Sequence, residues 1–157
     1  QQPEIIVLGE FMHSLLDEIV QAENMPPNAV TILIPNDLRV MVDRGHLNQI
    51  IWNLVRNAWQ HCQKKEGSIR IAARPGYLGD AIICELADDG PGIPGELRGQ
   101  IFEPFFTTRP GGTGLGLYIA RELADANGAA LELLPRGPGA HFRMTMKRAF
   151  KNKVKKR

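Results

Sequence analysis

Apolar residues recur every three or four positions in three segments of the chain, and elsewhere they form short β-branched runs. The helical spacing predicts helices over residues 9–22, 44–62 and 115–126. The short runs predict about six strands: AVTILIP, LRVMVD, SIRIAAR, AIICELAD, AALELLP and AHFRMTMK. The first two flank PNDL and the last two flank RGPG, so each pair is expected to form a hairpin. This order predicts an α+β fold, a two-layer α/β sandwich with three helices on one face of a mixed, mostly antiparallel sheet.

Size and composition fit one globular domain, with 157 residues, 43% hydrophobic residues and a formal net charge of +2. Positive charge gathers in the segment KRAFKNKVKKR, which we interpret as a solvated terminus. The sequence gives no sign of a nucleic-acid surface, and no direct nucleic-acid partner is expected. Cys62 and Cys84 lack metal-ligand spacing and indicate a reduced, cytoplasmic protein. The sequence has no apolar run of membrane-spanning length and no visible signal peptide. Because it starts at QQPE without Met, we expect it to be a piece of a longer protein.

The second predicted helix carries a stripe of amide side chains. Gln49, Asn53 and Asn57 lie four residues apart, and Gln60 and His61 continue the stripe by one turn. Asparagine is a poor helix former, so two of them within a helix call for a reason. One interpretation is an exposed face that tolerates Asn. The other is a cleft in which carboxamide oxygens hold a hard cation such as Mg²⁺.

The segment LADDGPGIP places Asp88 at the end of a strand, followed by Gly90 and Gly92. On local chemistry, a simple Asp-Gly turn is the commoner explanation. Alternatively, a carboxylate in this position accepts hydrogen bonds from an exocyclic amine, and the glycines allow a planar ligand to approach the backbone.

A glycine cluster opens the third predicted helix, with four glycines within six residues: Gly111, Gly112, Gly114 and Gly116. Free backbone N–H groups at a helix N-terminus, together with the helix dipole, favour a bound phosphate. An unusually flexible loop is the alternative, and four costly glycines make it the weaker one. Between Gly90 and Gly112 the chain is rich in Gly and Pro, which predicts a long loop. It can close over a ligand as a lid, with Phe102, Phe105 and Phe106 as apolar anchors.

These motifs, in this order, resemble the ATP-binding catalytic domain of sensor histidine kinases, within the gyrase–Hsp90–histidine kinase–MutL superfamily. The resemblance covers residues 30–146 and comprises NQIIWNLVRNAWQH (N box), DDGPGIP (G1 box), IFEPFFTTR (F box) and GGTGLGL (G2 box). It implies a Bergerat-type fold with a long ATP lid. FEPFFTT resembles the kinase branch, and the N box with FFTTRPGGTGLGL most resembles pilus- or nitrogen-regulating sensor kinases.

The resemblance implies a role for each matching residue. Asn57 would coordinate Mg²⁺ on the triphosphate, Asn53 would lie close to the phosphates, and Asp88 would bind the adenine amino group. His61 would lie near the base, and Arg109 on the lid would contribute to catalysis together with Asn57. The other expected ATP-binding residues are Gly90, Gly92, Thr108, Gly112, Thr113, Gly114, Leu115 and Gly116.

Three positions depart from the family pattern. Arg56 stands where ATP-hydrolysing branches carry a Glu general base, which favours phosphoryl transfer over self-contained hydrolysis. Gln60 stands where many kinases have Lys or Arg near the phosphates, so one positive contact is either lost or supplied by Arg109. Asn127 replaces a His often found before Gly.

The phosphoacceptor histidine expected from the resemblance is missing, because none of His13, His46, His61 and His141 has the His-Glu context of the family. We therefore expect residues 1–28 to be a connecting segment and first helix, 29–148 the ATP-binding domain, and 149–157 a basic tail. The implied partners are upstream dimerisation and phosphoacceptor helices, which would make a homodimer, and a cognate response regulator. Any membrane attachment would lie in absent upstream segments.

Two alternative functions stay open from the sequence alone. One is a superfamily kinase that phosphorylates serine, as anti-sigma-factor kinases do. The other is a non-catalytic module that senses ATP through closure of its lid.

Overall fold

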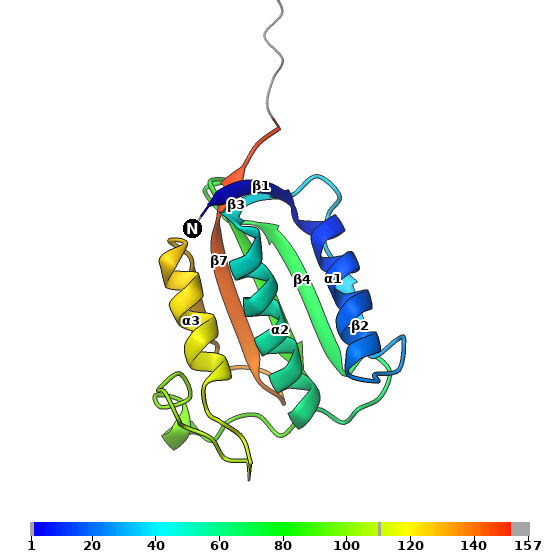
Figure 1. Ribbon diagram of the computed structural model, residues 1–157, viewed down its shortest axis with the longest axis vertical. Coiled ribbons are helices and arrows are strands. Elements are labelled where there is room, and N and C mark those ends of the chain that lie inside the picture. Colours follow the sequence, from blue (N-terminus) through cyan, green and yellow to red (C-terminus); the bar gives the residue numbers. More distant parts are fainter. Residues whose placement is uncertain (1, 110, 152–157) are drawn as a thin grey trace, which may run out of the picture.

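Three helices pack on one face of a curled mixed sheet, as Figure 1 shows. The computed structural model describes residues 2–109 and 111–151. The helices are α1 (Leu8–Ala22), α2 (Arg44–His61) and α3 (Gly116–Ala126), with a short 3-10 turn, η1 (Gly95–Leu97). The strands are β1 (Pro3–Val7), β2 (Val30–Leu33), β3 (Arg39–Asp43), β4 (Ile69–Pro75), β5 (Ala81–Asp88), β6 (Ala130–Leu133) and β7 (His141–Ala149). The predicted two-layer α+β sandwich is confirmed. No helix in the described ranges is long and apolar enough to cross a bilayer.

The sheet has the order β1-β3-β7-β5-β4-β2, and β6 pairs with β7. The predicted hairpin between β2 and β3 is wrong, because β2 pairs in parallel with β4. Strand β1, which the sequence reading missed, pairs antiparallel with one edge of β3, and β7 pairs with the other. Both edges of β3 are therefore taken, and β2 can pair only at the far edge of the sheet. The predicted hairpin of β6 and β7 is confirmed.

A single apolar core lies between the helices and the sheet. The predicted apolar face of α2 is buried throughout, with each residue at most 2% exposed: Leu47, Ile50, Ile51, Leu54, Val55 and Ala58. The sheet contributes Ile71, Ile82 and Phe142 from neighbouring strands, all similarly buried. Each buried Leu, Ile, Val or Phe side chain contributes about 1.5–3 kcal/mol through burial. The polar stripe of α2 lies away from this core.

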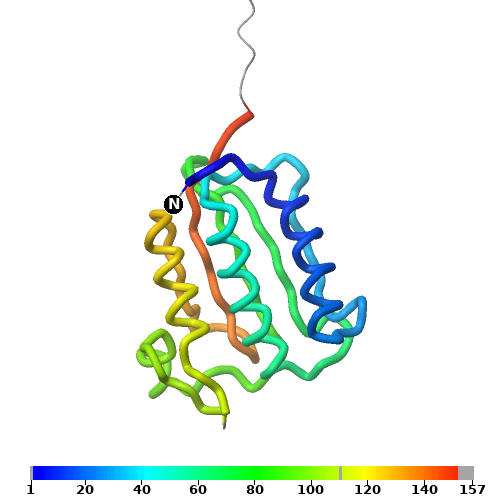
Figure 2. The backbone as a smooth tube through the Cα atoms, viewed as in Figure 1, coloured from blue at the N-terminus to red at the C-terminus, as the bar shows by residue number. Residues whose placement is uncertain are grey.

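A polar network holds the start of α2 against the end of α3. The Asp43 carboxylate caps α2 by accepting a hydrogen bond from the His46 backbone N–H at 3.0 Å. The Asp43 backbone N–H donates to Asn127 Oδ1 at 2.9 Å, and Asn127 Nδ2 donates to the Leu123 carbonyl at 2.7 Å. Asn127, the family departure after α3, thus fixes the two helices relative to one another. Figure 2 shows the end of α2 and the start of α3 near the loop at the opposite end of the molecule.

Candidate functional site

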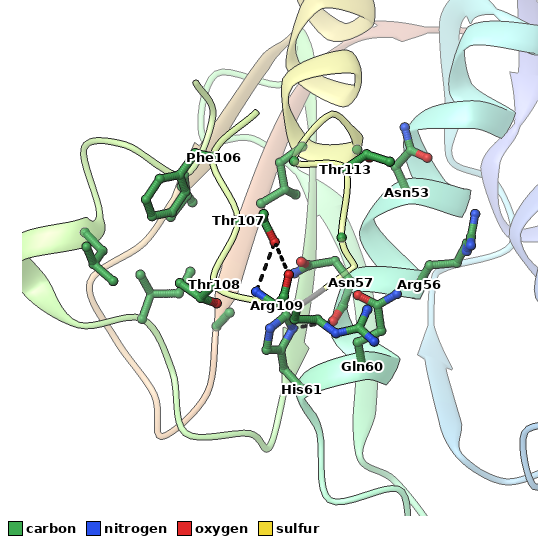
Figure 3. Close-up of a pocket in the computed structure, with 18 of the residues that line it drawn as sticks. Asn53, Arg56, Asn57, Gln60, His61, Phe106, Thr107, Thr108, Arg109 and Thr113 are labelled. Atoms are coloured by element: carbon green, nitrogen blue, oxygen red, sulfur yellow. Dashed lines mark hydrogen bonds between the residues drawn. The ribbon is translucent and has the colours of Figure 1, made fainter. Parts of the chain in front are cut away.

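A cavity of about 470 Å³ lies between α2, the end of β5, the loop after β5 and the start of α3. Figure 3 shows Asn57, Gln60 and His61 of α2 opposite Thr107, Thr108 and Arg109 of the loop. The expected site residues that line the cavity are Asn53, Asn57, His61, Asp88, Gly92, Thr108, Arg109, Gly112, Thr113, Gly114 and Gly116. Gly90 and Leu115 are not among the described lining residues. The sequence motifs thus converge on one cavity.

The α2 wall presents polar groups suited to phosphates and a cation. Asn53 Nδ2 is buried and has no hydrogen-bond partner among the described residues. Burying such a donor unpaired costs about 1–3 kcal/mol, which a phosphate oxygen or ordered water would offset. Asn57, one turn further, adds a carboxamide oxygen, a ligand type that Mg²⁺ prefers. The chemistry of these two side chains fits a magnesium-bound triphosphate.

The ring of His61 is fixed at the end of α2. Its Nδ1 lies 2.8 Å from the carbonyl oxygen of Asn57. A carbonyl only accepts hydrogen bonds, so Nδ1 carries the proton and donates. This bond orients the imidazole along the cavity wall, where a flat ring can pack against a base.

Asp88 is the buried acid of the cavity, with only 2% of its surface exposed. Its Oδ1 accepts hydrogen bonds from the backbone N–H groups of Gly90, at 2.8 Å, and Ala140, at 3.3 Å. Burial raises the pKa of the Asp88 carboxyl above its ordinary value, although these two hydrogen bonds oppose the shift. Both bonds from described residues go to Oδ1. Oδ2 is therefore the oxygen available to an exocyclic amine.

Asp89, the next residue, has a structural task instead. Its Oδ1 accepts a hydrogen bond from the Gln63 backbone N–H at 2.8 Å, and its Oδ2 accepts one from the Ser68 hydroxyl at 2.8 Å. Burial alone would raise the pKa of Asp89, but these hydrogen bonds outweigh it and lower the pKa. Asp89 therefore ties the loop after β5 to the segment after α2, while Asp88 faces the cavity.

Gly139, which the sequence reading treated only as part of a turn, packs directly against Asp88. A methyl group there would overlap the backbone carbonyl and the carboxylate of Asp88. We expect Gly139→Ala to displace Asp88, to weaken nucleotide binding about tenfold or more and to lower the free energy of unfolding by about 1–3 kcal/mol. Calorimetric titration and thermal melting measure the two effects. Gly99→Ala is the control, because a methyl group there meets no atom within 4 Å; equal behaviour of the two variants would contradict the prediction.

The glycine loop folds back on the F-box segment. Gly114 has a φ of +71°, and a side chain there would overlap the backbone of Phe105. The Phe105 backbone N–H donates to the Gly114 carbonyl at 2.9 Å. Phe102 and Phe106 pack partly against the core, as predicted for lid anchors. Phe105 differs from them, because it is 74% exposed, at a position where the backbone has a φ of +68°. Its role as an anchor over a bound ligand stays a prediction.

The start of α3 is open to an anion. No side chain caps this helix, in contrast to α2. The first N–H groups of any α-helix have no intrahelical partner, and here no capping side chain takes the place of one. On the loop beside it, the Thr107 hydroxyl oxygen accepts a hydrogen bond from the Arg109 backbone N–H at 3.1 Å. This turn holds Arg109 at the rim of the cavity, where a cation can meet a phosphate.

An apolar floor was missed by the sequence reading. It consists of Ile93, Leu97, Ile101, Leu117 and Ala140, from the loop after β5, the start of α3 and the turn before β7. Ile101 is 5% exposed. Such a floor suits the flat face of a purine. The isolated apolar residues within a Gly/Pro-rich loop were the available signal, but they follow no helical or strand period.

Both family departures on α2 line the cavity, Arg56 and Gln60. Arg56 Nε forms an ion pair with Glu23 at 2.9 Å, so this guanidinium is directed to the end of α1. The side chains of Arg56 and Glu23 are both partly exposed. An ion pair of this kind contributes about 0–1 kcal/mol to the free energy of unfolding.

Fold and cavity together define the class of protein, an ATPase domain of the type found in histidine kinases. The family model described as histidine kinase-, DNA gyrase B- and HSP90-like ATPase matches residues 42–149, and the chain belongs to this family. The predicted kinship with sensor histidine kinases is confirmed, and the serine-kinase and sensor-only alternatives are not favoured.

Individual relatives are named as sensor or regulatory proteins. The sensor protein kinase PilS of Pseudomonas aeruginosa is 34% identical over 149 residues, which cover 92% of this chain and 28% of PilS. The nitrogen regulation protein NtrY of Azorhizobium caulinodans is 33% identical, covering 73% of this chain and 16% of NtrY. The solved catalytic domain of histidine kinase ThkA has a TM-score of 0.76 at 29% identity, covering 94% of this chain and 97% of that domain. The chain thus spans less than a third of either curated relative.

Proposed function

We propose that this domain binds Mg·ATP and delivers the γ-phosphoryl group to a histidine on a dimerisation domain outside the chain. The observation that carries the proposal is the convergence of Asn53, Asn57, Asp88 and the glycine loop on one cavity. Phosphoryl transfer depends mainly on positioning and charge neutralisation, so few catalytic side chains are needed. An amide wall, a buried carboxylate and an open helix N-terminus are sufficient for that task.

Each end of the nucleotide has a complementary part of the cavity. The adenine would donate its amino hydrogen to Asp88 Oδ2 and lie against the apolar floor. The phosphates would take hydrogen bonds from Asn53 Nδ2 and from the backbone N–H groups of Gly114 and Gly116. The Gly112 N–H, which here donates to the Arg109 carbonyl at 3.1 Å, would join them on leaving that carbonyl. Mg²⁺, when bound, neutralises phosphate charge, and Asn57 Oδ1 is the side-chain oxygen that would hold it.

We place this activity in the cytoplasm, within a two-component sensor in which residues 29–148 form the catalytic unit. The acceptor histidine would lie on upstream helices of a homodimer, and a response regulator aspartate would receive the phosphoryl group next. The kinship with PilS supports this arrangement. Arg56 at the place of the general base in hydrolysing relatives also supports transfer over hydrolysis.

The test combines this chain, Mg²⁺ and γ-labelled ATP with the separately expressed helices of a related sensor kinase that carry the acceptor histidine. We expect labelled helices whose phosphoryl group is lost in acid and retained in base, as phosphohistidine requires. An acid-stable label would indicate serine. If the chain binds ATP tightly but transfers no phosphoryl group to any of several acceptor domains, its function would be nucleotide sensing.

Nucleotide binding should depend on the protonation of Asp88. Its carboxyl pKa is raised by burial, so protonation begins at a higher pH than for an ordinary aspartate. Binding needs the ionised form to accept the adenine amine, so affinity is expected to be constant at high pH and to fall as the pH is lowered through the raised pKa of Asp88. Calorimetric titrations over a pH series measure this. The nucleotide's own titration is common to wild type and Asp88→Asn, so an identical pH profile in the two would contradict the prediction.

A further inference from the structure

We propose that the end of the sheet opposite the nucleotide cavity binds the surface of an anionic lipid bilayer. The hairpin-tip patch consists of Tyr77 and Leu78 from the β4–β5 turn, and of Lys147, Arg148, Phe150 and Lys151 from the end of β7 and the residues after it. This is a peripheral contact and is separate from any membrane attachment through upstream segments.

Tyr77 and Leu78 project outward from a closed turn. Their relative exposures are 103% and 83%, among the highest of the large apolar residues described. The turn beneath them is held by hydrogen bonds from the Gly76 N–H to the Ala81 carbonyl at 2.8 Å and from the Gly79 N–H to the Gly76 carbonyl at 3.0 Å. A rigid turn that presents two apolar side chains can insert them into a bilayer interface with little loss of conformational entropy.

Arg148 holds a third exposed apolar side chain, that of Phe150, beside the β4–β5 turn. Its backbone N–H donates to the Asp80 carbonyl at 3.0 Å, and its Nη1 donates to the Gly79 carbonyl at 3.3 Å. The guanidinium carbon lies 4.5 Å from the ring centroid of Phe150, which is 61% exposed. Phe150 is therefore fixed beside the β4–β5 turn, and apolar and cationic groups form one surface.

The charge distribution complements an anionic surface. The last 11 residues carry seven of the 19 Lys and Arg residues and no Asp or Glu, so the remaining residues carry a net charge of −5. Within the described part of the chain, Lys147, Arg148 and Lys151 form no salt bridge. Asp80 is the exposed acid on the turn itself. Clusters of four to eight basic residues next to apolar side chains are typical of proteins that bind anionic lipids.

The position of the patch is compatible with activity. Figures 1 and 2 show the end of β7 and the lid loop at opposite ends of the molecule. A domain held at the bilayer through Tyr77 and Phe150 would keep its cavity open to the solvent. Protruding apolar side chains surrounded by cations favour a lipid interface over a nucleic acid, which would need the cations alone.

Co-sedimentation with vesicles tests the proposal. The chain is mixed with vesicles of phosphatidylcholine alone or of phosphatidylcholine containing phosphatidylglycerol. We expect binding only to the anionic vesicles, with loss at high salt. A Tyr77→Ser, Leu78→Ser double variant and a Lys147→Gln, Lys151→Gln double variant should each bind about tenfold more weakly. These side chains are exposed, so the melting temperatures should match wild type.

A Lys64→Gln, Lys65→Gln double variant is the matched control, because it removes the same charge from the loop after α2. It should retain vesicle binding. Failure of the wild-type chain to sediment with anionic vesicles would overturn the proposal, and so would equal weakening by the control. A third outcome is that the chain does not bind vesicles but binds a DNA duplex, and that the Tyr77→Ser, Leu78→Ser variant binds the duplex as well as wild type. That outcome would indicate that the partner is a nucleic acid and not a lipid.

Discussion

We expect Asn57→Ala to lower Mg²⁺-dependent phosphoryl transfer to a supplied acceptor domain by about 10²- to 10³-fold, the loss typical when one electrostatic contact to a transition state is removed. Asn57 lines the cavity on the polar stripe of α2, where its side-chain oxygen would hold the cation. ATP affinity should fall much less, by about tenfold, because the adenine and glycine-loop contacts remain. Single-turnover transfer of labelled phosphate and calorimetric ATP titration separate the two effects.

The fold of this variant should survive, because alanine is a better helix former than asparagine by about 0.5 kcal/mol. Asn48→Ala is the matched control, since Asn48 lies on the same helix and lines a different groove, between α1 and β1. It should retain full transfer. Normal phosphoryl transfer by a folded Asn57→Ala domain would contradict the proposed role of Asn57 as a ligand of Mg²⁺.

Asp88→Asn is expected to weaken ATP binding by about 30- to 100-fold, which corresponds to about 2–3 kcal/mol. The reason lies in the backbone donors of Gly90 and Ala140, which both point at Oδ1. They fix the amide oxygen of the variant at that place, so its NH₂ group would face the adenine amino group. Two donors would then meet where one acceptor is needed.

Asp89→Asn provides the control for this prediction, because it makes the same chemical change one residue away and outside the cavity. The Asp89→Asn variant should bind ATP normally. Its free energy of unfolding should be lower by about 1–2 kcal/mol, because the change weakens the hydrogen bonds that Asp89 accepts from Gln63 and Ser68. Burial raises the pKa of Asp88, so its charged form costs folding free energy at neutral pH. Asp88→Asn should therefore melt no lower than wild type. Equal ATP affinities of the two variants would exclude Asp88 as the adenine contact.

The sequence predicted those parts of the fold and site that local patterns specify. The apolar face of α2 and its amide stripe follow from a period of 3.6 residues along one helix. Asp88 was located because a strand pattern ends there, and the glycine loop because it leads directly into α3. Each of these signals lies within a short stretch of sequence.

Long-range pairing explains what was missed. Strand β2 pairs with β4 almost 40 residues later, Val30 opposite Ile69, and nothing in either segment indicates a parallel partner. Gly139 and Ala140 reach Asp88 only because β7 pairs with β5 from Lys147 opposite Ala81 to His141 opposite Ala87. Their role in the cavity therefore depends on sheet register, which local turn chemistry does not reveal.

One junction in the sheet has a mechanical consequence. β1 pairs with β3 along its full length, and β3 ends at Asp43 where α2 begins at Arg44. No linker separates β3 from α2, so a tilt of β1 would move β3 and, with it, change the direction of the α2 axis. The far turns of that helix carry Asn57 and His61. A small displacement of β1 at one end of the domain would thus shift Asn57 and His61 in the wall of the cavity at the other end.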